Sequence, residues 1–204
     1  MIKDIGIIDY DMGNISSLSN AIIEVGGQPS IINDPSSVAG FSKIILPGVG
    51  AFKDAISNLR SKQFIGVLND FASSGKKILG ICLGMQLMCK NSSENGYFDG
   101  LGWFDAEVNK LPKASNIKLP HIGWNEVNFC KQNVLLETIE DKSDFYFVHG
   151  YHVECKNYED ILSTSFHGIN FVSAIQNKNI TGVQFHPEKS QSAGLSLIKN
   201  FLES

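Results

Sequence analysis

The chain has 204 residues, of which 43% are hydrophobic and 19% are charged, enough to bury a substantial core. Its formal net charge is −4 and its lysines and arginines form no block, which argues against nucleic-acid binding. Asp4, Asp9 and Asp11 interrupt any N-terminal signal segment, and no stretch approaches the ~20 apolar residues of a membrane span. We therefore expect one domain over residues 1–204, located in the cytoplasm, without a membrane or nucleic-acid partner.

The first half of the chain predicts alternating strands and helices. A β-branched strand over residues 5–9 precedes apolar residues at helical spacing from Ile15 to Val25, which Gly26 and Gly27 end. The alternation recurs as a strand over residues 43–46, a helix around residues 64–71, and a strand over residues 77–79 with a helix behind it. Such repeated units favour an open, mostly parallel sheet with helices on both faces.

The second half, from about Gly102, has a different pattern. Alternating or aromatic runs at residues 144–149, 169–175 and 180–185 indicate strands, and we expect this half to be richer in antiparallel pairs. Residues 111–119 are expected to form a long exposed loop, and Leu195, Ile198 and Leu202 mark a last amphipathic helix. The predicted fold class is α/β, with antiparallel strands in the C-terminal half.

Cysteine and histidine spacing gives no sign of a disulfide or a metal site. The four cysteines, at positions 82, 89, 130 and 155, include no Cys-x-x-Cys pair, and we interpret them as reduced thiols. His149 and His152 are close in sequence, but in one alternating strand they would face opposite sides of the sheet. We expect neither a metal nor a cofactor.

Residues 80–84, Gly-Ile-Cys-Leu-Gly, predict a strand, a sharp turn and a helix with Cys82 at the bend. Flanking glycines allow a tight turn and the close approach of a substrate, as at the nucleophile elbow of hydrolases. A thiol there would face the N-terminus of the following helix, whose dipole favours the thiolate. A glycine-flanked cysteine can also be an ordinary packed residue of a buried strand, so the motif alone leaves both interpretations open.

Two further candidates follow predicted strands. His186 could act as the base for Cys82 and Glu188 could orient the imidazole, because Pro187 stiffens the link between them. The backbone N–H of Leu83 and one from Val49 or Gly50 could form an oxyanion hole. Ligands of open α/β sheets bind beyond the carboxyl ends of the strands, where all these groups are expected.

The motifs together resemble a known family. Residues 80–86 read Gly-Ile-Cys-Leu-Gly-Met-Gln and residues 186–190 read His-Pro-Glu-Lys-Ser, which is similar to the class I (triad) glutamine amidotransferases. Residues 47–52, Pro-Gly-Val-Gly-Ala-Phe, and residues 120–125, Pro-His-Ile-Gly-Trp-Asn, narrow the resemblance to the glutaminase subunits of imidazole glycerol phosphate synthase. The resemblance covers essentially the whole chain and implies a single glutamine amidotransferase domain.

This resemblance implies hydrolysis of glutamine to glutamate and ammonia through a Cys82, His186 and Glu188 triad, without a cofactor. It implies that Gln86, Glu94, Gly50 and Tyr151 line the glutamine pocket, with Glu94 facing the α-ammonium group. It also implies that the peptide of Val49 reorients to complete the oxyanion hole when a partner signals.

The resemblance further implies a heterodimer with a (β/α)8 barrel cyclase. That partner would receive the ammonia and make imidazole glycerol phosphate and an aminoimidazole carboxamide ribotide in histidine biosynthesis. The residues that match the family's partner-facing side are Asn14, His121, Trp124, Tyr146 and Lys189.

Two departures from the family pattern keep further functions open. Gly150 stands where relatives more often carry a hydroxyl residue, and Ser16 and Ser17 follow the first loop where relatives often have a basic or long residue. The same chemistry could therefore serve a sugar amidotransferase of surface-polysaccharide biosynthesis. The pattern also leaves room for a γ-glutamyl peptidase that needs no partner and for a non-catalytic binding module on the same fold.

Overall fold

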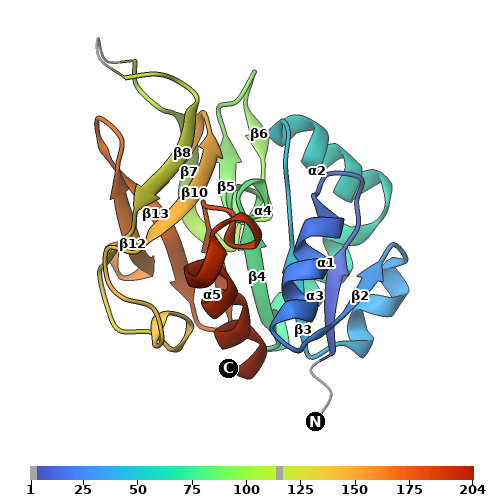
Figure 1. Cartoon of the computed structure of the whole chain (residues 1–204). Coiled ribbons are helices and arrows are strands. Elements are labelled where there is room, and N and C mark those ends of the chain that lie inside the picture. Colours follow the sequence, from blue (N-terminus) through green and yellow to red (C-terminus); the bar gives the residue numbers. More distant parts are fainter. Residues whose placement is uncertain (1–3, 114–116) are drawn as a thin grey trace.

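The structure is a computed structural model that describes residues 4–113 and 117–204. A large central sheet lies between helices, and a smaller sheet covers one part of it (Figure 1). The strands of the first half and their helices are β1 (Asp4–Ile8), α1 (Ile15–Glu24), β2 (Gln28–Ile32), η1 (Pro35–Gly40), β3 (Lys43–Leu46), α2 (Phe52–Ser61), α3 (Phe64–Ser73), β4 (Lys77–Ile81) and α4 (Leu83–Leu87).

The remaining elements are mostly strands. They are β5 (Cys89–Ser92), β6 (Phe98–Asp99), β7 (Phe104–Lys110), β8 (His121–Glu126), β9 (Asn128–Phe129), η2 (Val134–Leu136), β10 (Asp144–His149), β11 (Tyr151–Cys155), η3 (Tyr158–Asp160), β12 (Ile161–Phe166), β13 (Asn170–Asn177), β14 (Ile180–Val183), η4 (Pro187–Lys189) and α5 (Gln191–Glu203).

Five strands in the order β2-β1-β3-β4-β14 form the parallel part of the large sheet. The apolar runs of β1, β3, β4 and β14 are buried on both faces, as is usual for parallel strands covered by helices, whereas the edge strand β2 leaves Ile31 exposed. The register places Leu46 of β3 beside Gly80 of β4, and Gly80 beside Gly182 of β14. The carboxyl ends of β3, β4 and β14 therefore meet at one edge, and the chain segments that follow them start side by side.

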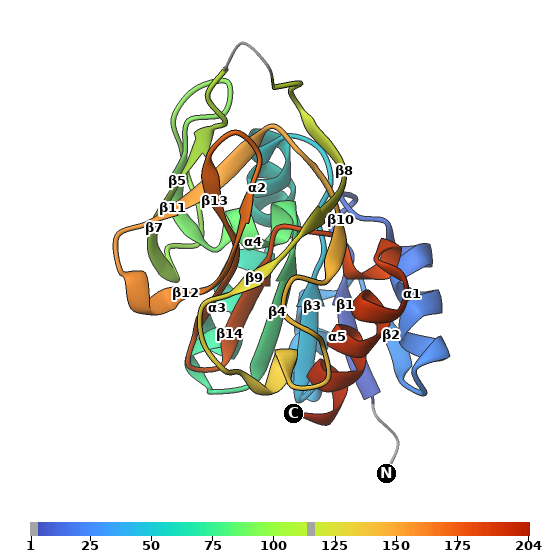
Figure 2. The ribbon, with the colours of Figure 1, turned by 60° about the vertical axis from the view of Figure 1, so that its left-hand side comes forward.

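Helices cover both faces of this sheet, which confirms the prediction. Leu18 and Ile22 of α1 pack with α5 in one core cluster, and Phe52 of α2 and Phe64 of α3 belong to the other. Figure 2 shows α1 and α5 side by side, on the face away from α2 and α3. The helix α2 and the strand β2 were not among the predicted elements.

The second half contains the expected antiparallel pairs. β13 pairs antiparallel with β11, β12 and β14, and β11 pairs antiparallel with β7. β8 and β10 form a separate two-stranded antiparallel sheet. Within residues 111–120 the described residues belong to no helix or strand, in line with the predicted loop, and residues 114–116 lie outside the described part.

The expectation that His149 and His152 share one alternating strand is wrong. β10 ends at His149 and pairs with β8, whereas β11 begins at Tyr151 and pairs with β7 and β13. The chain changes sheets at Gly150, so the period of one strand does not relate the two imidazoles. Among the described residues, no group of three or more potential metal ligands occurs, and no helix is long and apolar enough to cross a membrane.

Candidate active site

Cys82 occupies a sharp bend between β4 and α4, as predicted. Its backbone has φ 54° and ψ −109°, a conformation that a residue with a side chain rarely adopts. The bend needs glycine at position 84, because a Cβ there would lie 1.8 Å from the carbonyl oxygen of Leu46. α4 has only five residues, so the helix dipole behind the thiol is short.

The thiol of Cys82 lines a small cavity of about 250 Å³ at the carboxyl edge of the sheet. Cys82 is 6% exposed, and its Sγ lies 3.6 Å from Nε2 of Gln184 and 3.9 Å from the carbonyl oxygen of Val148. The lining residues are Val49, Gly50, Cys82, Leu83, Gln86, Glu94, Val148, His149, Gly150, Tyr151 and His186. Every residue that we expected at the oxyanion hole or the substrate pocket is in this set.

His186 and Glu188 form a buried ion pair beside that cavity. Nδ1 of His186 lies 2.8 Å from Oε1 of Glu188, and their side chains are 2% and 4% exposed. Nε2 of His186 is buried and has no hydrogen-bond partner among the described residues. Burial lowers the pKa of His186, but Cys82 and Glu188 raise it more, so the pKa lies above its usual value. The arrangement fixes one ring nitrogen and leaves the other for proton exchange.

One backbone hydrogen bond and two bonds of the Ser190 hydroxyl tie the His186 segment to β10. The N–H of His186 donates to the carbonyl of Tyr146 at 2.9 Å, and the N–H of Tyr146 donates to Oγ of Ser190 at 3.0 Å. The Ser190 hydroxyl in turn donates to the carbonyl of His186 at 2.6 Å. β10 therefore sets the position of the imidazole.

The turn after β3 lies against the elbow, but its amide at Val49 is occupied. The N–H of Val49 donates to the carbonyl of Met12 at 3.1 Å, and Gly50 has φ 105°. The Tyr10 hydroxyl donates to the carbonyl of Pro47 at 2.6 Å and so fixes the start of the turn. In this conformation the Val49 N–H is engaged with the protein itself.

The pocket residues implied by the resemblance are hydrogen-bonded to the protein. Oε2 of Glu94 accepts from the N–H of Phe52 at 2.8 Å, which anchors the half-buried carboxylate at the start of α2. Nε2 of Gln86 donates to the carbonyl of Tyr151 at 3.1 Å. These bonds hold both side chains at the cavity wall.

The family profile described as "Glutamine amidotransferase class-I" matches residues 6–204. The chain belongs to this family. It is 43% identical to "Imidazole glycerol phosphate synthase subunit HisH" of Sulfurimonas denitrificans over 97% of this chain and 96% of that protein. It is also 44% identical to "Imidazole glycerol phosphate synthase subunit HisH 2" of Methanococcus maripaludis over 98% of each chain.

The amidotransferase fold is also found among solved structures. The structure of PurLQS from Thermotoga maritima superposes with a TM-score of 0.81, covering 100% of this chain and 99% of that one at 17% identity. At that identity the likeness concerns the fold alone. The match over essentially the full length agrees with the α/β class predicted from the sequence.

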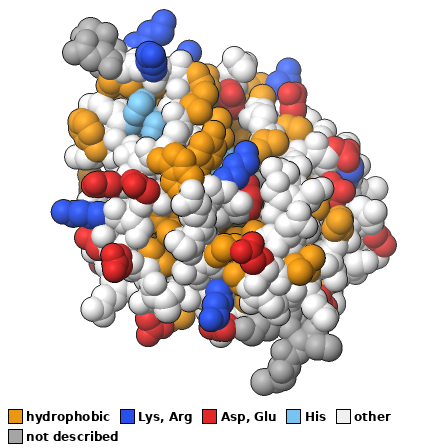
Figure 3. All heavy atoms as spheres, viewed as in Figure 1, with side chains coloured by type: hydrophobic (Ala, Val, Ile, Leu, Met, Phe, Trp, Pro, Cys, Tyr) orange, Lys and Arg blue, Asp and Glu red, His pale blue; other side chains and the backbone are white. Residues whose placement is uncertain are grey.

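Three of the expected partner-facing residues lie together at the surface of this amidotransferase. Trp124 of β8 is 46% exposed and meets the ring of Tyr146 of β10 edge to face, with 6.0 Å between centroids. Nζ of the exposed Lys189 lies 5.7 Å from the centre of the Tyr146 ring. Ile122, 60% exposed, continues the outer face of β8, and Figure 3 shows hydrophobic side chains gathered over β8 and β10.

The other two expected partner-facing residues are placed differently. His121 is only 3% exposed, and its ring stacks on Phe147 inside the molecule, so its side chain does not reach this surface. Asn14 is half-buried at the start of α1 and lines a small cleft together with Val49 and Glu188. Asn14 therefore lies beside the candidate oxyanion turn and not on the surface formed by Trp124, Tyr146 and Lys189.

Two buried residues that touch the site, Gln184 and Tyr10, were not predicted from the sequence. Gln184 is fully buried with its amide against Cys82. Burial, and next the negative charge that Cys82 can carry, raise the pKa of Tyr10 far above its usual range, which keeps the phenol a donor. A polar residue within the apolar run of residues 180–185 was a usable signal for Gln184, whereas nothing local marked Tyr10.

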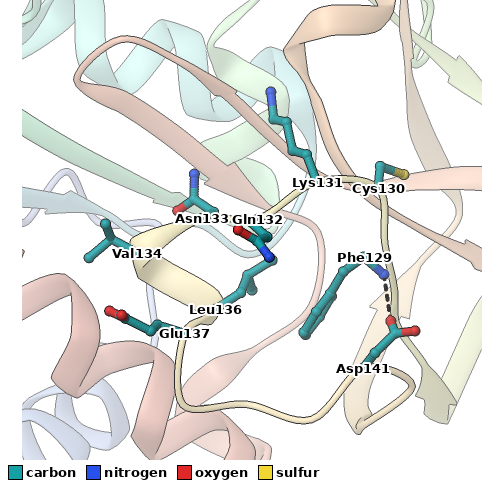
Figure 4. Close-up of a pocket in the computed structure, with 9 residues that line it drawn as sticks. All are labelled: Phe129, Cys130, Lys131, Gln132, Asn133, Val134, Leu136, Glu137 and Asp141. Atoms are coloured by element: carbon teal, nitrogen blue, oxygen red, sulfur yellow. Dashed lines mark hydrogen bonds between the residues drawn. The ribbon is translucent and has the colours of Figure 1, made fainter.

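A larger cavity lies elsewhere, on the loop between β9 and β10 (Figure 4). It measures about 940 Å³, and its residues are Phe129, Cys130, Lys131, Gln132, Asn133, Val134, Leu136, Glu137 and Asp141. No imidazole of the described chain lines it, and Asp141 accepts a hydrogen bond from the N–H of Phe129 at 2.8 Å. Because its described lining places no base of this kind beside Cys130, this cavity lacks the arrangement found at Cys82.

Proposed function

We propose that the chain is a glutaminase that hydrolyses L-glutamine to L-glutamate and ammonia for a synthase partner. One observation carries the proposal: Cys82 at the elbow lines one cavity with His186, and Glu188 holds the other ring nitrogen of His186 from behind. Membership of the class-I glutamine amidotransferase family supports the same chemistry.

In the proposed reaction, Nε2 of His186 takes the thiol proton and Sγ of Cys82 attacks the side-chain carbon of glutamine. His186 then gives a proton to the departing ammonia, and water hydrolyses the thioester to release glutamate. The hydrogen bond from Nδ1 of His186 to Glu188 supports these roles, because it directs the unpartnered Nε2 to the transfer.

The cavity offers groups for the ends of glutamine. We assign Glu94 to the α-ammonium group: its carboxylate lines the cavity, while the N–H of Phe52 holds one of its oxygens. Gly50, Gln86 and Tyr151 complete the proposed pocket. Gly150 can contribute only backbone atoms to the pocket. A Cβ at this position would meet no described atom closer than 3.9 Å, so the space that a hydroxyl side chain takes in relatives stays open in this chain.

The proposed oxyanion hole consists of the N–H of Leu83 and one from the Val49–Gly50 turn. Because the Val49 N–H donates to Met12, it must leave that bond to serve an oxyanion. Each donor of this kind is typically worth about a hundredfold or more in rate. We therefore expect the chain alone to turn over slowly, with stimulation by a partner.

The proposed partner is a (β/α)8 barrel cyclase that uses the ammonia to make imidazole glycerol phosphate and an aminoimidazole carboxamide ribotide in histidine biosynthesis. The names of the relatives, subunits of imidazole glycerol phosphate synthase, support this client and an assembly with another subunit, which we propose to be a heterodimer in the cytoplasm. The cluster of Trp124, Tyr146 and Lys189 is the proposed docking surface, and Tyr146 is one hydrogen bond from His186.

The deciding experiment measures glutamate release by the purified chain, alone and with the barrel cyclase of the same cell. We expect stimulation of at least about a hundredfold when the cyclase and its nucleotide substrate are present. Full activity of the chain alone, or on γ-glutamyl peptides, would contradict the proposal. Stimulation by a sugar amidotransferase but not by the cyclase would reassign the client and leave the glutaminase chemistry intact.

Trp124→Ala is expected to weaken the complex with the cyclase. An exposed aromatic side chain that packs on a neighbouring ring is typical of interface residues whose loss costs ~2 kcal/mol, so Kd should rise about 30-fold. Titration calorimetry of the two purified subunits measures this change. Tyr158→Ala, on η3, is the matched control, because it removes another exposed aromatic ring, 83% exposed, and should leave Kd unchanged.

A further inference from the structure

Gln184 is a buried amide that touches the thiol without lining the cavity. Its side chain is fully buried, and its Nε2 lies 3.6 Å from Sγ of Cys82. Its backbone is fixed by a hydrogen bond from its N–H to the carbonyl of Ser173 at 2.9 Å. Gln184 is absent from the described cavity wall, so any effect it has on the reaction passes through its contacts with Cys82 and Gln86.

The orientation of the Gln184 amide follows from its other partner. Nε2 of Gln86 lies 3.0 Å from Oε1 of Gln184 and 3.1 Å from the carbonyl oxygen of Tyr151. A backbone carbonyl only accepts, and the two N–H groups of one amide can serve two acceptors. Gln86 therefore donates to both, and Gln184 presents its oxygen to Gln86 and its N–H to the sulfur.

The chain of hydrogen bonds continues to the outer strand β8. The Tyr151 carbonyl also accepts from Nδ1 of His149 at 2.8 Å, so Nε2 of His149 is the acceptor for Nδ1 of His121 at 3.0 Å. Nε2 of His121 faces the side-chain amide of Asn125 at 3.3 Å, which also donates to the carbonyl of Phe166. Asn125 thus donates to His121, His121 donates to His149, and His149 donates to the Tyr151 carbonyl.

The two imidazoles stay neutral near pH 7, as this direction requires. Burial, the largest cause, and the neighbouring imidazole of His167 lower the pKa of His121 to about 4. Burial likewise lowers the pKa of His149 to about 3, against the hydrogen bond to Tyr151. A neutral imidazole donates from one nitrogen and accepts at the other, so the chain of bonds is complete without a buried charge.

We propose that Gln184 is a positioning residue for Cys82: its amide N–H donates to Sγ, and Gln86, anchored on the Tyr151 carbonyl that His149 also engages, fixes the orientation of that amide. The donated hydrogen bond holds the sulfur towards the cavity. It also favours the thiolate, because an anionic sulfur is the stronger acceptor. The inference rests on the proposed function only in taking Cys82 as the nucleophile.

The test uses the intact chain without a partner or glutamine. Alkylation of Cys82 by iodoacetamide is followed between pH 5 and pH 10 by mass spectrometry of its peptide, in the wild type, Gln184→Met and Gln184→Glu. Methionine keeps the length but lacks a donor, and glutamate keeps the shape but places an acceptor against the sulfur. We expect the rate at pH 7 to fall about tenfold in Gln184→Met and further in Gln184→Glu, with the profile displaced to higher pH.

Two controls show whether a change in Cys82 alkylation comes from the lost Gln184 hydrogen bond or from a general change of structure. The exposed Cys130 in the same samples is the internal control, and its alkylation should not change. The other titratable groups that line the cavity or act on the thiol keep their identities in both variants: Tyr10, Glu94, His149, Tyr151, His186 and, through His186, Glu188.

If the pH dependence of Cys82 alkylation is unchanged in a folded variant, the proposal is overturned, whether or not the stability of that variant has changed. If Gln184→Met does not fold, Gln184→Glu decides by the same criterion. Because the readout needs no glutamine, a displaced profile supports the positioning role even if the chain proves not to be a glutaminase. Glutamine hydrolysis with undisplaced profiles keeps the proposed function and overturns this role.

Discussion

Cys82→Ala is expected to lower glutamine-dependent glutamate release by the complex at least about a thousandfold. The alanine removes the only atom proposed to form the thioester, and His186 alone then has no acyl acceptor to activate. Glutamate release is measured with the cyclase and its nucleotide substrate present. The synthase reaction supplied with ammonium instead of glutamine should run at the wild-type rate, because it bypasses the elbow.

The matched control for this variant is Cys130→Ala. Cys130 is also a free thiol, but it is exposed on the loop between β9 and β10, and the described lining of its cavity includes no imidazole. Its loss should leave both the glutamine and the ammonium reactions unchanged. Glutamine-dependent activity that survives in Cys82→Ala would show that the nucleophile has been assigned to the wrong residue.

The parts of the site that sequence predicted best are local. The elbow at Cys82 follows from glycines at fixed offsets, and the His186–Glu188 pair follows from two positions separated by one proline. Their meeting could also be predicted, because parallel strands of repeated strand–helix units end at one edge of a sheet. Gln86, Glu94 and Tyr151 came from the family resemblance, since nothing in their immediate neighbourhoods marks them as pocket residues.

The burial of His121 follows from the sequence once residues 121–126 are taken as a strand. His121 and Trp124 are three positions apart in β8, an odd offset, so in a strand they face opposite sides. Trp124 on the outer face therefore implies His121 on the inner face. The two residues could not both have side chains on one partner-facing surface.

Other features depend on contacts between distant segments. The bond from the Val49 N–H to the Met12 carbonyl joins two loops, and no side-chain pattern reports a backbone hydrogen bond. The amide of Gln184 reaches Cys82 only because β14 lies beside β4 in register. Sequence periodicity predicts which elements exist, while such pairings follow from how the elements are packed.

Gly84→Ala is expected to lower the free energy of unfolding by about 3 kcal/mol. The added Cβ would lie 1.8 Å from the carbonyl oxygen of Leu46 and 2.9 Å from its carbonyl carbon. Both atoms are backbone at the end of β3, which is paired with β4 and cannot rotate aside. α4 would have to move away from the strand, so the bend at Cys82 and the turn at Val49 would separate.

Urea denaturation of the single chain, followed by circular dichroism, measures this loss as a lower midpoint. Gly66→Ala is the matched control, because Gly66 lies on the exposed side of α3 and an added Cβ meets no described atom within 4 Å. That control should raise the free energy of unfolding by ~1 kcal/mol, since alanine favours the helix. Wild-type stability of Gly84→Ala would refute the close approach of α4 to β3, and glycine at position 84 would then not be what sets the geometry of the proposed nucleophile.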